Sequence, residues 1–268
     1  MNRYEIAVIS MPGSPRRKQV AENLRELQDV RWSFFDGLTA EVEVPGISNI
    51  PERQIGRFGR VLGNAEIGCF KSHVSLLTNF LHLRTHPWLL VMEDDVWLDD
   101  RFDIGEVMDF AEAQGLHYVR LFAKAYKPAR VIGSLSGFRQ VIRFKTDPYG
   151  TQAYLISKQG ANAFLKNLKF IERPIDDEFG RFWHHGLLPV SVFPFPAAER
   201  ALGSTIEKDR DGGGPRIRYR GDLLAFRAVE KLRKSMTNLR ETIPWIGVTG
   251  TRLPINAILS RLTAGAGS

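Results

Sequence analysis

The chain has 268 residues, of which 43% are hydrophobic and 25% charged, and its formal net charge is +7. This composition is typical of a globular protein, and no apolar run approaches the length that a membrane-spanning helix needs. Cys69 is the single cysteine, which excludes an intramolecular disulfide and a cysteine-cluster metal site.

The first part of the chain predicts alternating strands and helices. Residues 4–10 (YEIAVIS) are typical of a buried strand, and the start of the chain is too short and too polar for a secretory signal, so we expect a cytoplasmic protein. A helix is expected from Pro15 to Gln28, because proline is favoured in the first turn. A short strand is expected at 32–35. Residues 41–63 are rich in glycine, proline and charge, which predicts a loop.

A long helix and a buried strand follow. Asn64 is suited to cap a helix that runs to Leu83 with one apolar stripe. Residues 88–92 predict a strand that leads directly into three carboxylates. The further elements expected up to residue 168 are a helix at 105–114, strands at 117–122, 139–144 and 151–157, and a helix at 157–168. Because strands alternate with helices, we expect an α/β domain with a mostly parallel central sheet.

The character of the chain changes towards its end. We expect one domain over residues 1–210, and over residues 211–268 a flexible link followed by a basic helical C-terminal extension. From Arg216 to Arg240, eight basic residues stand against two acidic ones. Apolar residues recur there at three- and four-residue steps, which indicates an amphipathic helix: Leu223, Phe226, Val229, Leu232, Met236 and Leu239.

This basic helix has two interpretations. It could dock on an anionic membrane surface, or it could pack on its own domain with a solvated basic side. The chain has no nucleic-acid motif and no interleaving of aromatic and basic residues, so we expect no nucleic-acid partner.

The stretch WLLVMEDDVWL places Glu93, Asp94 and Asp95 directly after a buried strand. Side chains alternate along a strand, so Glu93 and Asp95 are expected on one face and Asp94 on the other. In α/β sheets ligands bind beyond the carboxyl ends of strands, where this triplet falls. Because hard cations prefer carboxylate oxygens, we expect Glu93 and Asp95 to bind Mn²⁺ or Mg²⁺. The alternative is an acidic strand end exposed to solvent.

Five further residues are candidates from their positions. Glu66 and His73 lie two turns apart on one face of a helix, where His73 suits a phosphate or a sugar hydroxyl, unless it is buried in the core. Arg16 and Arg17 stand near a helix start and suit a diphosphate. Asp176, in RPIDDEF, is a candidate general base, with a helix-start charge as the alternative.

Eight blocks in this order resemble glycosyltransferase family 25, the bacterial lipooligosaccharide galactosyltransferases and their relatives. The blocks are VISMPGSPRRK, FFDG, NAEIGCFKSH, LLVMEDDV, YVRL, GTQAYLIS, RPIDDEF and ALGSTIEKDR. The resemblance implies a GT-A-like nucleotide-sugar-binding fold and a metal-dependent UDP-sugar glycosyltransferase that inverts. It also implies galactose as the donor sugar and a lipid-linked lipooligosaccharide or lipopolysaccharide core glycan as the acceptor. Such an acceptor would place the enzyme at the inner face of the cytoplasmic membrane.

The resemblance also assigns roles to residues. Glu93 and Asp95 fall on the family's metal and diphosphate motif, and Asp176 falls on an aspartate that we interpret as the base. The residues that match donor-binding blocks are Ser10, Arg16, Arg17, Glu66, Ser72, His73, Asp94, Gly150, Thr151 and Tyr154. Pro15 stands where family members often have an acidic residue, which leaves the partner of Arg16 open.

Two other functions compete with this one. A metal-dependent phosphohydrolase with an aspartate nucleophile needs a second aspartate two places on, whereas Val96 stands two places after Asp94. A non-catalytic nucleotide- or membrane-binding relative would keep the fold and use the basic helix, although the presence of Glu93 and Asp95 favours catalysis. An assay of UDP-sugar hydrolysis discriminates between these functions.

Overall fold

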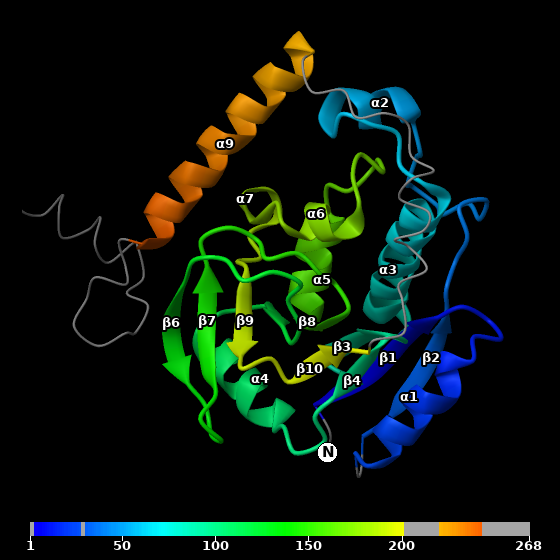
Figure 1. Cartoon of the computed structure of the whole chain (residues 1–268), viewed down its shortest axis with the longest axis vertical. Helices are drawn as coiled ribbons and strands as arrows, with labels where there is room; N and C mark the ends of the chain where they lie inside the picture. The colour runs from blue at the N-terminus through cyan, green and yellow to red at the C-terminus, as the bar shows by residue number, and fades with distance from the viewer. Residues whose placement is uncertain (1–2, 28–29, 201–219, 243–268) are drawn as a thin grey trace, which may run out of the picture.

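The computed structural model describes residues 3–27, 30–200 and 220–242. Its centre is a sheet in the order β2-β1-β3-β8-β5-β9-β7-β6 (Figure 1). The strands of this sheet are β1 (Tyr4–Ser10), β2 (Trp32–Asp36), β3 (Trp88–Glu93), β5 (Tyr118–Arg120), β6 (Ala129–Ser134), β7 (Gln140–Phe144), β8 (Ala153–Ser157) and β9 (Val190–Phe193). A separate antiparallel pair joins β4 (Val96–Leu98) to β10 (Ala197–Glu199).

Most strands of the central sheet run in one direction. β1 pairs in parallel with β2 and β3, and β5 pairs in parallel with β9. β8 lies antiparallel between β3 and β5, and β7 lies antiparallel between β9 and β6. The expected α/β fold with a largely parallel sheet is confirmed, with β7 and β8 as the reversed strands of the described sheet.

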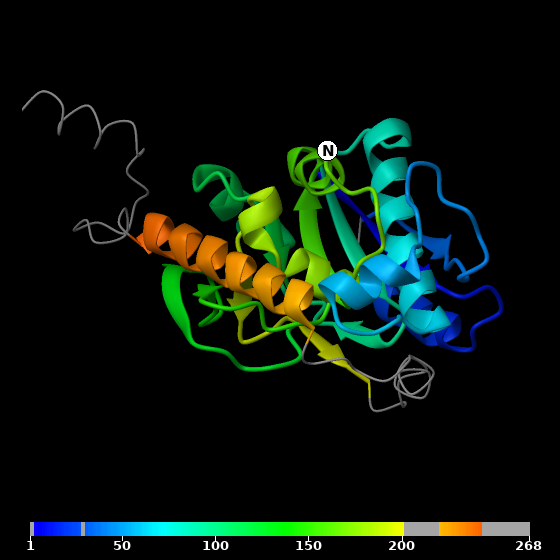
Figure 2. The ribbon, with the colours of Figure 1, turned by 90° about the horizontal axis from the view of Figure 1, so that it is seen from above.

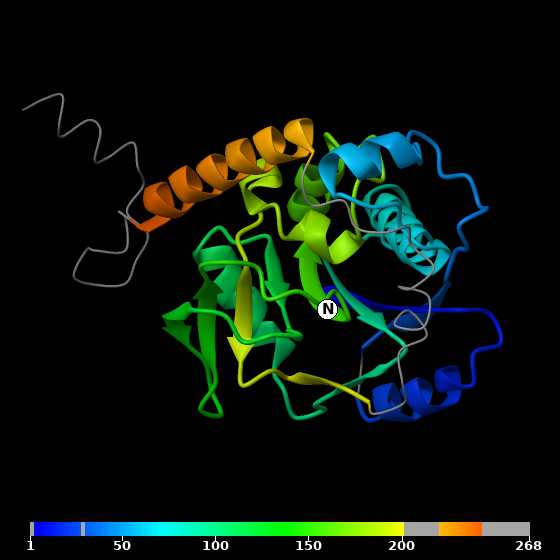
Figure 3. The ribbon, with the colours of Figure 1, turned by 45° about the horizontal axis from the view of Figure 1, so that its top comes forward.

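Helices cover both faces of the sheet. The helices are α1 (Arg16–Arg25), α2 (Pro51–Arg57), α3 (Asn64–Leu83), α4 (Ile104–Ala113), α5 (Lys158–Leu165), α6 (Ile175–Phe179), α7 (Phe182–His185) and α9 (Gly221–Thr242). Neighbouring residues of one strand enter different cores: Ile6 and Val8 pack with α1 and α4, whereas Ala7 packs with α3, α5 and α6. Figure 3 shows α1 and α3 on opposite sides of the sheet. Both faces are therefore apolar, as expected for an α/β sheet.

Local side-chain contacts fix where two helices begin. α3 starts one residue after Gly63, whose N–H donates to Glu66 Oε2 at 3.1 Å, the backbone half of a capping box. Asn64, expected as the cap, is instead the first helical residue. The hydroxyl of Ser157 caps α5 by accepting a hydrogen bond from the N–H of Gly160 at 3.1 Å.

Several elements differ from the expectations, among them α2, β6 and β9. Residues 41–63 were expected to form a loop, but they contain α2. The helix is stabilised by the buried Gln54, whose side chain donates to the carbonyl of Ile171 and accepts from the N–H of Leu62. β6 and β9 were not expected. β9 has four residues and is followed within the chain by Pro194, so it carries too little pattern to be recognised.

α9 lies along the margin of the molecule in Figure 1, in front of the domain in Figure 2, and contacts α2 and α7. Phe226 of α9 lies beneath the guanidinium groups of Arg57, at 4.5 Å, and Arg173, at 5.6 Å. Residues 211–219, within the expected flexible link, lie outside the described residues. In the described part of the chain, no helix is long and apolar enough to cross a membrane.

Candidate active site

The carboxyl ends of three neighbouring strands form the floor of the site. β1 and β3 are parallel with Ile9 opposite Glu93, and the N–H of Gly37, just after β2, donates to the carbonyl of Ser10 at 2.9 Å. Because β8 is antiparallel, its beginning also lies at this edge, where Glu93 N–H donates to the carbonyl of Gln152 at 2.8 Å. Segments from four strands therefore meet where the acidic triplet leaves β3.

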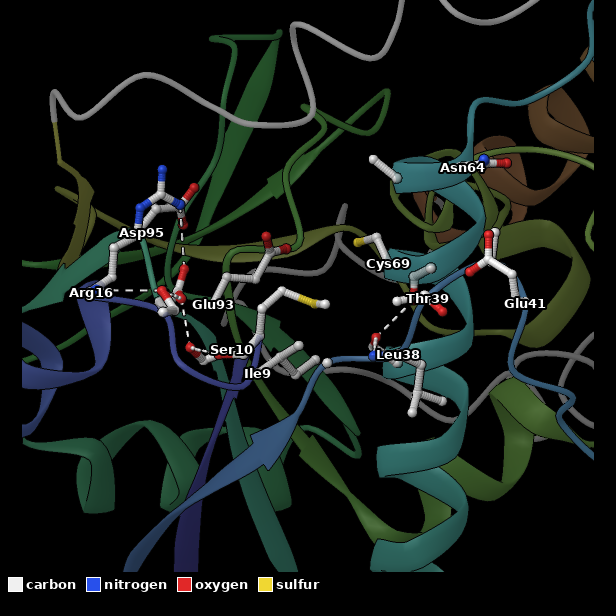
Figure 4. A pocket seen from close by; sticks show the side chains of 18 of the residues that line it. Ile9, Ser10, Arg16, Leu38, Thr39, Glu41, Asn64, Cys69, Glu93 and Asp95 are labelled. Carbon is white, nitrogen blue, oxygen red and sulfur yellow. Dashed lines mark hydrogen bonds and ion pairs between the residues drawn. The ribbon is translucent and has the colours of Figure 1, made fainter.

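A cavity of about 680 Å³ lies above these strand ends, with the first half of α3 as its opposite wall. Figure 4 shows Ser10, Glu93 and Asp95 on one side of it and Cys69 of α3 on the other. Its volume is that of a typical small-molecule site. The lining residues are Ile9, Ser10, Met11, Ser14, Pro15, Arg16, Gly37, Leu38, Thr39, Ala40, Glu41, Asn64, Ala65, Gly68, Cys69, Ser72, Glu93, Asp94 and Asp95.

The carboxylate of Asp94 organises the loop between β1 and α1. The hydroxyls of Ser10 and Ser14 donate to Asp94 Oδ2 at 2.6 and 2.8 Å, and Arg16 donates to Oδ1 at 3.4 Å. Asp94 is thus the partner of Arg16. Arg17 turns away to the carbonyl of Ser10 and to the carboxylate at the end of β2, and it does not line the cavity. Of the two arginines, Arg16 is the one placed to meet a bound anion.

Glu93 points towards α3 and meets a buried polar chain. His73 is fully buried, with Nδ1 2.9 Å from the Tyr154 hydroxyl and Nε2 3.5 Å from Glu93 Oε1. Burial raises the pKa of Tyr154 well above its usual value, so its hydroxyl stays protonated. The buried His73 Nε2 lies near Glu93 but forms no hydrogen bond with the described residues. The Thr151 hydroxyl donates to Glu93 Oε1 at 3.4 Å. Glu93 therefore lies at the end of a buried polar chain that runs from Tyr154 through His73.

A cysteine joins the same cluster. The Cys69 thiol, one His73 ring nitrogen and one Glu93 oxygen all lie within 4.8 Å of one another. Burial, followed by the charge of Glu93, raises the pKa of Cys69 well above its usual value. The thiol therefore stays protonated at neutral pH, and the carboxylates are the better ligands for a cation.

Asp95 lies in an environment that disfavours its ionised form. β3 ends at Glu93 and Asp95 lies in the following turn, so the expected strand alternation does not extend to it. Burial, with the charges of Glu93 and Glu199, raises the pKa of Asp95 to about 7 against the opposing charge of Arg16. Its buried Oδ1 has no hydrogen-bond partner among the described residues. Crowded carboxylate oxygens with an unpartnered buried atom fit a hard divalent cation.

Asp176 lies in a second cavity that the same carboxylates line. A smaller cavity of about 60 Å³ adjoins the first, and Glu93 and Asp95 line both. Asp176, at the start of α6 after Pro174, lines this smaller cavity and accepts a hydrogen bond from the N–H of Asp177 at 2.9 Å. The structure thus brings together three carboxylates that are up to 83 residues apart in the sequence.

Three other predicted residues hold the walls in place. Glu66 makes two 2.7 Å bonds to Arg60 and lines the smaller cavity. The Ser72 hydroxyl accepts from the N–H of Leu38 at 2.8 Å, which fastens the wall after β2 to α3. Gly150 has φ +92°, a conformation that favours glycine, and lines the smaller cavity beside Thr151.

Sequence reasoning missed several residues of the site. Cys69 lines both cavities although its position in NAEIGCFKSH suggested only a buried small residue. Lys124 lines the smaller cavity, and residues 37–41 form a wall of the larger one. The FFDG block ends at Gly37 and was the signal that pointed to this wall.

A family model described as glycosyltransferase family 25 (LPS biosynthesis protein) matches residues 4–179. The chain is 25% identical over 260 residues to the human protein named inactive glycosyltransferase 25 family member 3, covering 86% of this chain and 43% of that protein. A probable inactive member 3 from Bos taurus is 25% identical over 219 residues, covering 72% of this chain and 36% of that protein. The chain spans less than half the length of these curated relatives.

Two solved structures show a weaker likeness. One is a glycosyltransferase involved in glycosylation of the major capsid of PBCV-1, with a TM-score of 0.34, 12% identity, and coverage of 60% of this chain and 63% of that chain. The other is A197 from STIV, with a TM-score of 0.39, 14% identity, and coverage of 71% of this chain and 81% of that chain. These TM-scores are too low for the likenesses to carry an argument.

Proposed function

The chain belongs to glycosyltransferase family 25, and from this premise we propose that it moves galactose from UDP-galactose to a hydroxyl of a lipid-linked lipopolysaccharide or lipooligosaccharide core glycan. The observation that carries the proposal is the convergence of Glu93, Asp95 and Asp176 on two adjoining cavities. The larger cavity, at about 680 Å³, has the volume for a nucleotide sugar.

The donor is proposed to lie with its diphosphate near Glu93 and Asp95. These two carboxylates would hold Mn²⁺ or Mg²⁺, which when bound offsets the negative charge of the diphosphate leaving group. Arg16 lines the same cavity and adds a positive charge beside the anion. The cation and Arg16 would thus offset the repulsion between the carboxylates and the diphosphate.

Asp176 is proposed as the general base. The acceptor oxygen forms a bond to the anomeric carbon while the bond from that carbon to the diphosphate oxygen breaks, and the hydroxyl proton passes to Asp176. A single displacement of this kind inverts the anomeric configuration. Asp176 lines the smaller cavity together with Glu93 and Asp95, near the place proposed for the diphosphate, which supports this role.

Asp176→Asn tests the base, and the adjacent Asp177→Asn is its matched control, because Asp177 does not line either cavity. We expect Asp176→Asn to lower turnover by about 10²–10⁴-fold, the usual contribution of general-base catalysis. UDP binding, measured by calorimetry, should be retained in both variants. Equal turnover of Asp176→Asn and the wild type would remove Asp176 from the base role.

A second candidate is a non-catalytic nucleotide-binding relative. The names of the curated relatives, which describe inactive members of the same family at 25% identity, favour it. A screen of UDP-galactose, UDP-glucose and UDP-N-acetylglucosamine with Mn²⁺ separates the candidates. A transferase consumes one of these donors, whereas a binding protein is stabilised by UDP and consumes none.

A further inference from the structure

α9 carries an apolar stripe on the side that faces solvent. Val229, Leu232, Met236 and Leu239 are 46%, 61%, 62% and 66% exposed. They follow one another at steps of three, four and three residues, so they lie along one side of the helix. We call these four residues the outward stripe. A helix of a globular domain normally turns such a stripe to the core.

The opposite side of α9 packs on the domain. Leu223 is fully buried on this side, and Glu230 is buried and accepts from Arg181 Nε at 2.7 Å and from Trp183 Nε1 at 3.2 Å. Lys234 donates to the Thr146 hydroxyl at 3.0 Å. The domain therefore holds α9 through Leu223 and several polar contacts, and the outward stripe stays uncovered among the described residues.

The charges beside the outward stripe are positive. Arg233 and Arg240 follow Val229 and Met236 by four residues and so lie along one border, while Lys231 lies towards the other; all three are exposed. The carboxylate of Glu230 is turned inward to Arg181. An exposed apolar stripe between cationic borders is complementary to an anionic lipid surface, where apolar side chains enter the interface and cations meet headgroups.

Other occupants of the stripe fit less well. A second copy docked through the same stripe would bring the cationic borders of two helices together. A nucleic acid would use the cations and leave the four apolar side chains without a partner. Figure 1 shows α9 along the edge of the molecule, and Figure 2 shows it in front of the domain, a placement that lets a flat surface reach its full length.

We propose that the outward stripe of α9 docks the protein on an anionic membrane surface, with the helix lying parallel to it. This inference does not depend on the transfer reaction. It does place a lipid-linked acceptor near the enzyme, in keeping with the proposed substrate. The helix is fixed to the domain through Glu230 and Arg181, so membrane docking would also orient the cavity relative to the lipid.

The test is sedimentation of the full chain with vesicles of phosphatidylglycerol and phosphatidylcholine in equal parts, and with vesicles of phosphatidylcholine alone. The wild type should sediment with the anionic vesicles and stay in solution with the neutral ones. Leu232→Ser combined with Met236→Ser should weaken binding about tenfold or more through lost apolar burial. Lys231→Gln combined with Arg233→Gln should weaken binding about fivefold for each charge removed. Leu83→Ser, at a leucine 76% exposed on α3, is the matched control and should bind as the wild type does.

Two results would overturn the proposal. One is binding to anionic vesicles that is absent, or unchanged by the stripe variants. The other is a wild-type dimer in light scattering that becomes monomeric in Leu232→Ser with Met236→Ser, which would assign the stripe to a second copy. UDP-sugar turnover without vesicles, measured on the same variants, should stay unchanged, so failure of membrane docking is distinguishable from failure of the proposed transfer.

Discussion

Asp95 and Asp94 are neighbours in the sequence with opposite surroundings. Asp94 receives two serine hydroxyls and Arg16, whereas Asp95 has a buried oxygen without a partner among the described residues. The triplet itself could be predicted as a site from its place after a buried strand. The different surroundings of Asp94 and Asp95 could not be predicted, because they depend on how the loop after β1 folds over Asp94.

The raised pKa of Asp95 predicts how stability depends on pH. Its pKa moves from 3.8 to about 7, so the native state binds the proton more tightly, and the stability gained below pH 4 is lost as pH rises to 7. Without divalent cations, Asp95→Asn should therefore be more stable than the wild type at pH 8, by a few degrees in Tm at about 2–4 °C per kcal/mol. The two proteins should converge near pH 4 in thermal unfolding scans.

Asp94→Asn is the control for this pH series. It weakens the acceptor for two serine hydroxyls and Arg16, so its Tm should fall below that of the wild type instead of rising. Mn²⁺ should then raise the Tm of the wild type and leave that of Asp95→Asn nearly unchanged. A Tm for Asp95→Asn below that of the wild type at pH 8 would contradict the view that the ionised carboxylate of Asp95 destabilises the fold.

At the scale of elements, α3 and the segment after β2 pack together as one wall of the larger cavity. Lys71 Nζ donates to the carbonyls of Ala40 and Val42 at 2.5 and 2.7 Å, and Ser72 holds Leu38. α3 and the segment after β2 lie so close together that a Cβ added to Gly68 would lie 2.5 Å from the Leu38 carbonyl oxygen. Gly68 therefore lets the segment after β2 lie directly against α3, and an added side chain would displace that segment.

Gly68→Ala should weaken UDP binding by displacing this wall. The substitution gains about 1 kcal/mol of helix propensity but costs roughly 1–3 kcal/mol in overpacking, so the protein should still fold. Gly56→Ala on α2 is the matched control, because its added Cβ meets only Asp222 Oδ2, at 3.6 Å. Calorimetric titration of UDP should show weaker binding for Gly68→Ala and wild-type binding for Gly56→Ala. Equal affinity in both variants would show that this wall does not contact the nucleotide.

Elements with a strong pattern could be predicted, and those that depend on distant contacts could not. The helix Asn64–Leu83 has the expected bounds because a long apolar stripe defines it. α2 is stabilised by the hydrogen bond from Gln54 to the carbonyl of Ile171, and the local sequence does not predict a contact between residues so far apart in the chain. The antiparallel direction of β8 also could not be predicted from the sequence, although this direction places Thr151 beside Glu93.

At the scale of the whole molecule, the ordered blocks predicted the family, and the acidic triplet after a buried strand predicted the sheet edge where the cavities lie. The placement of α9 could not be derived in the same way. Periodicity shows that one side of a helix is apolar, but it does not say which side meets the domain. The contacts of Glu230 with Arg181 and Trp183 decide this, and they leave the outward stripe exposed.

The central claim is that carboxylates at the end of β3 hold a divalent cation that in turn holds a nucleotide diphosphate. The most direct test is calorimetric titration of UDP into the wild-type protein with Mn²⁺ and again with EDTA. We predict binding with Mn²⁺ that is lost in EDTA and lost in Asp95→Asn. UDP binding of equal affinity in Mn²⁺ and in EDTA, or unchanged binding by Asp95→Asn, would contradict the claim.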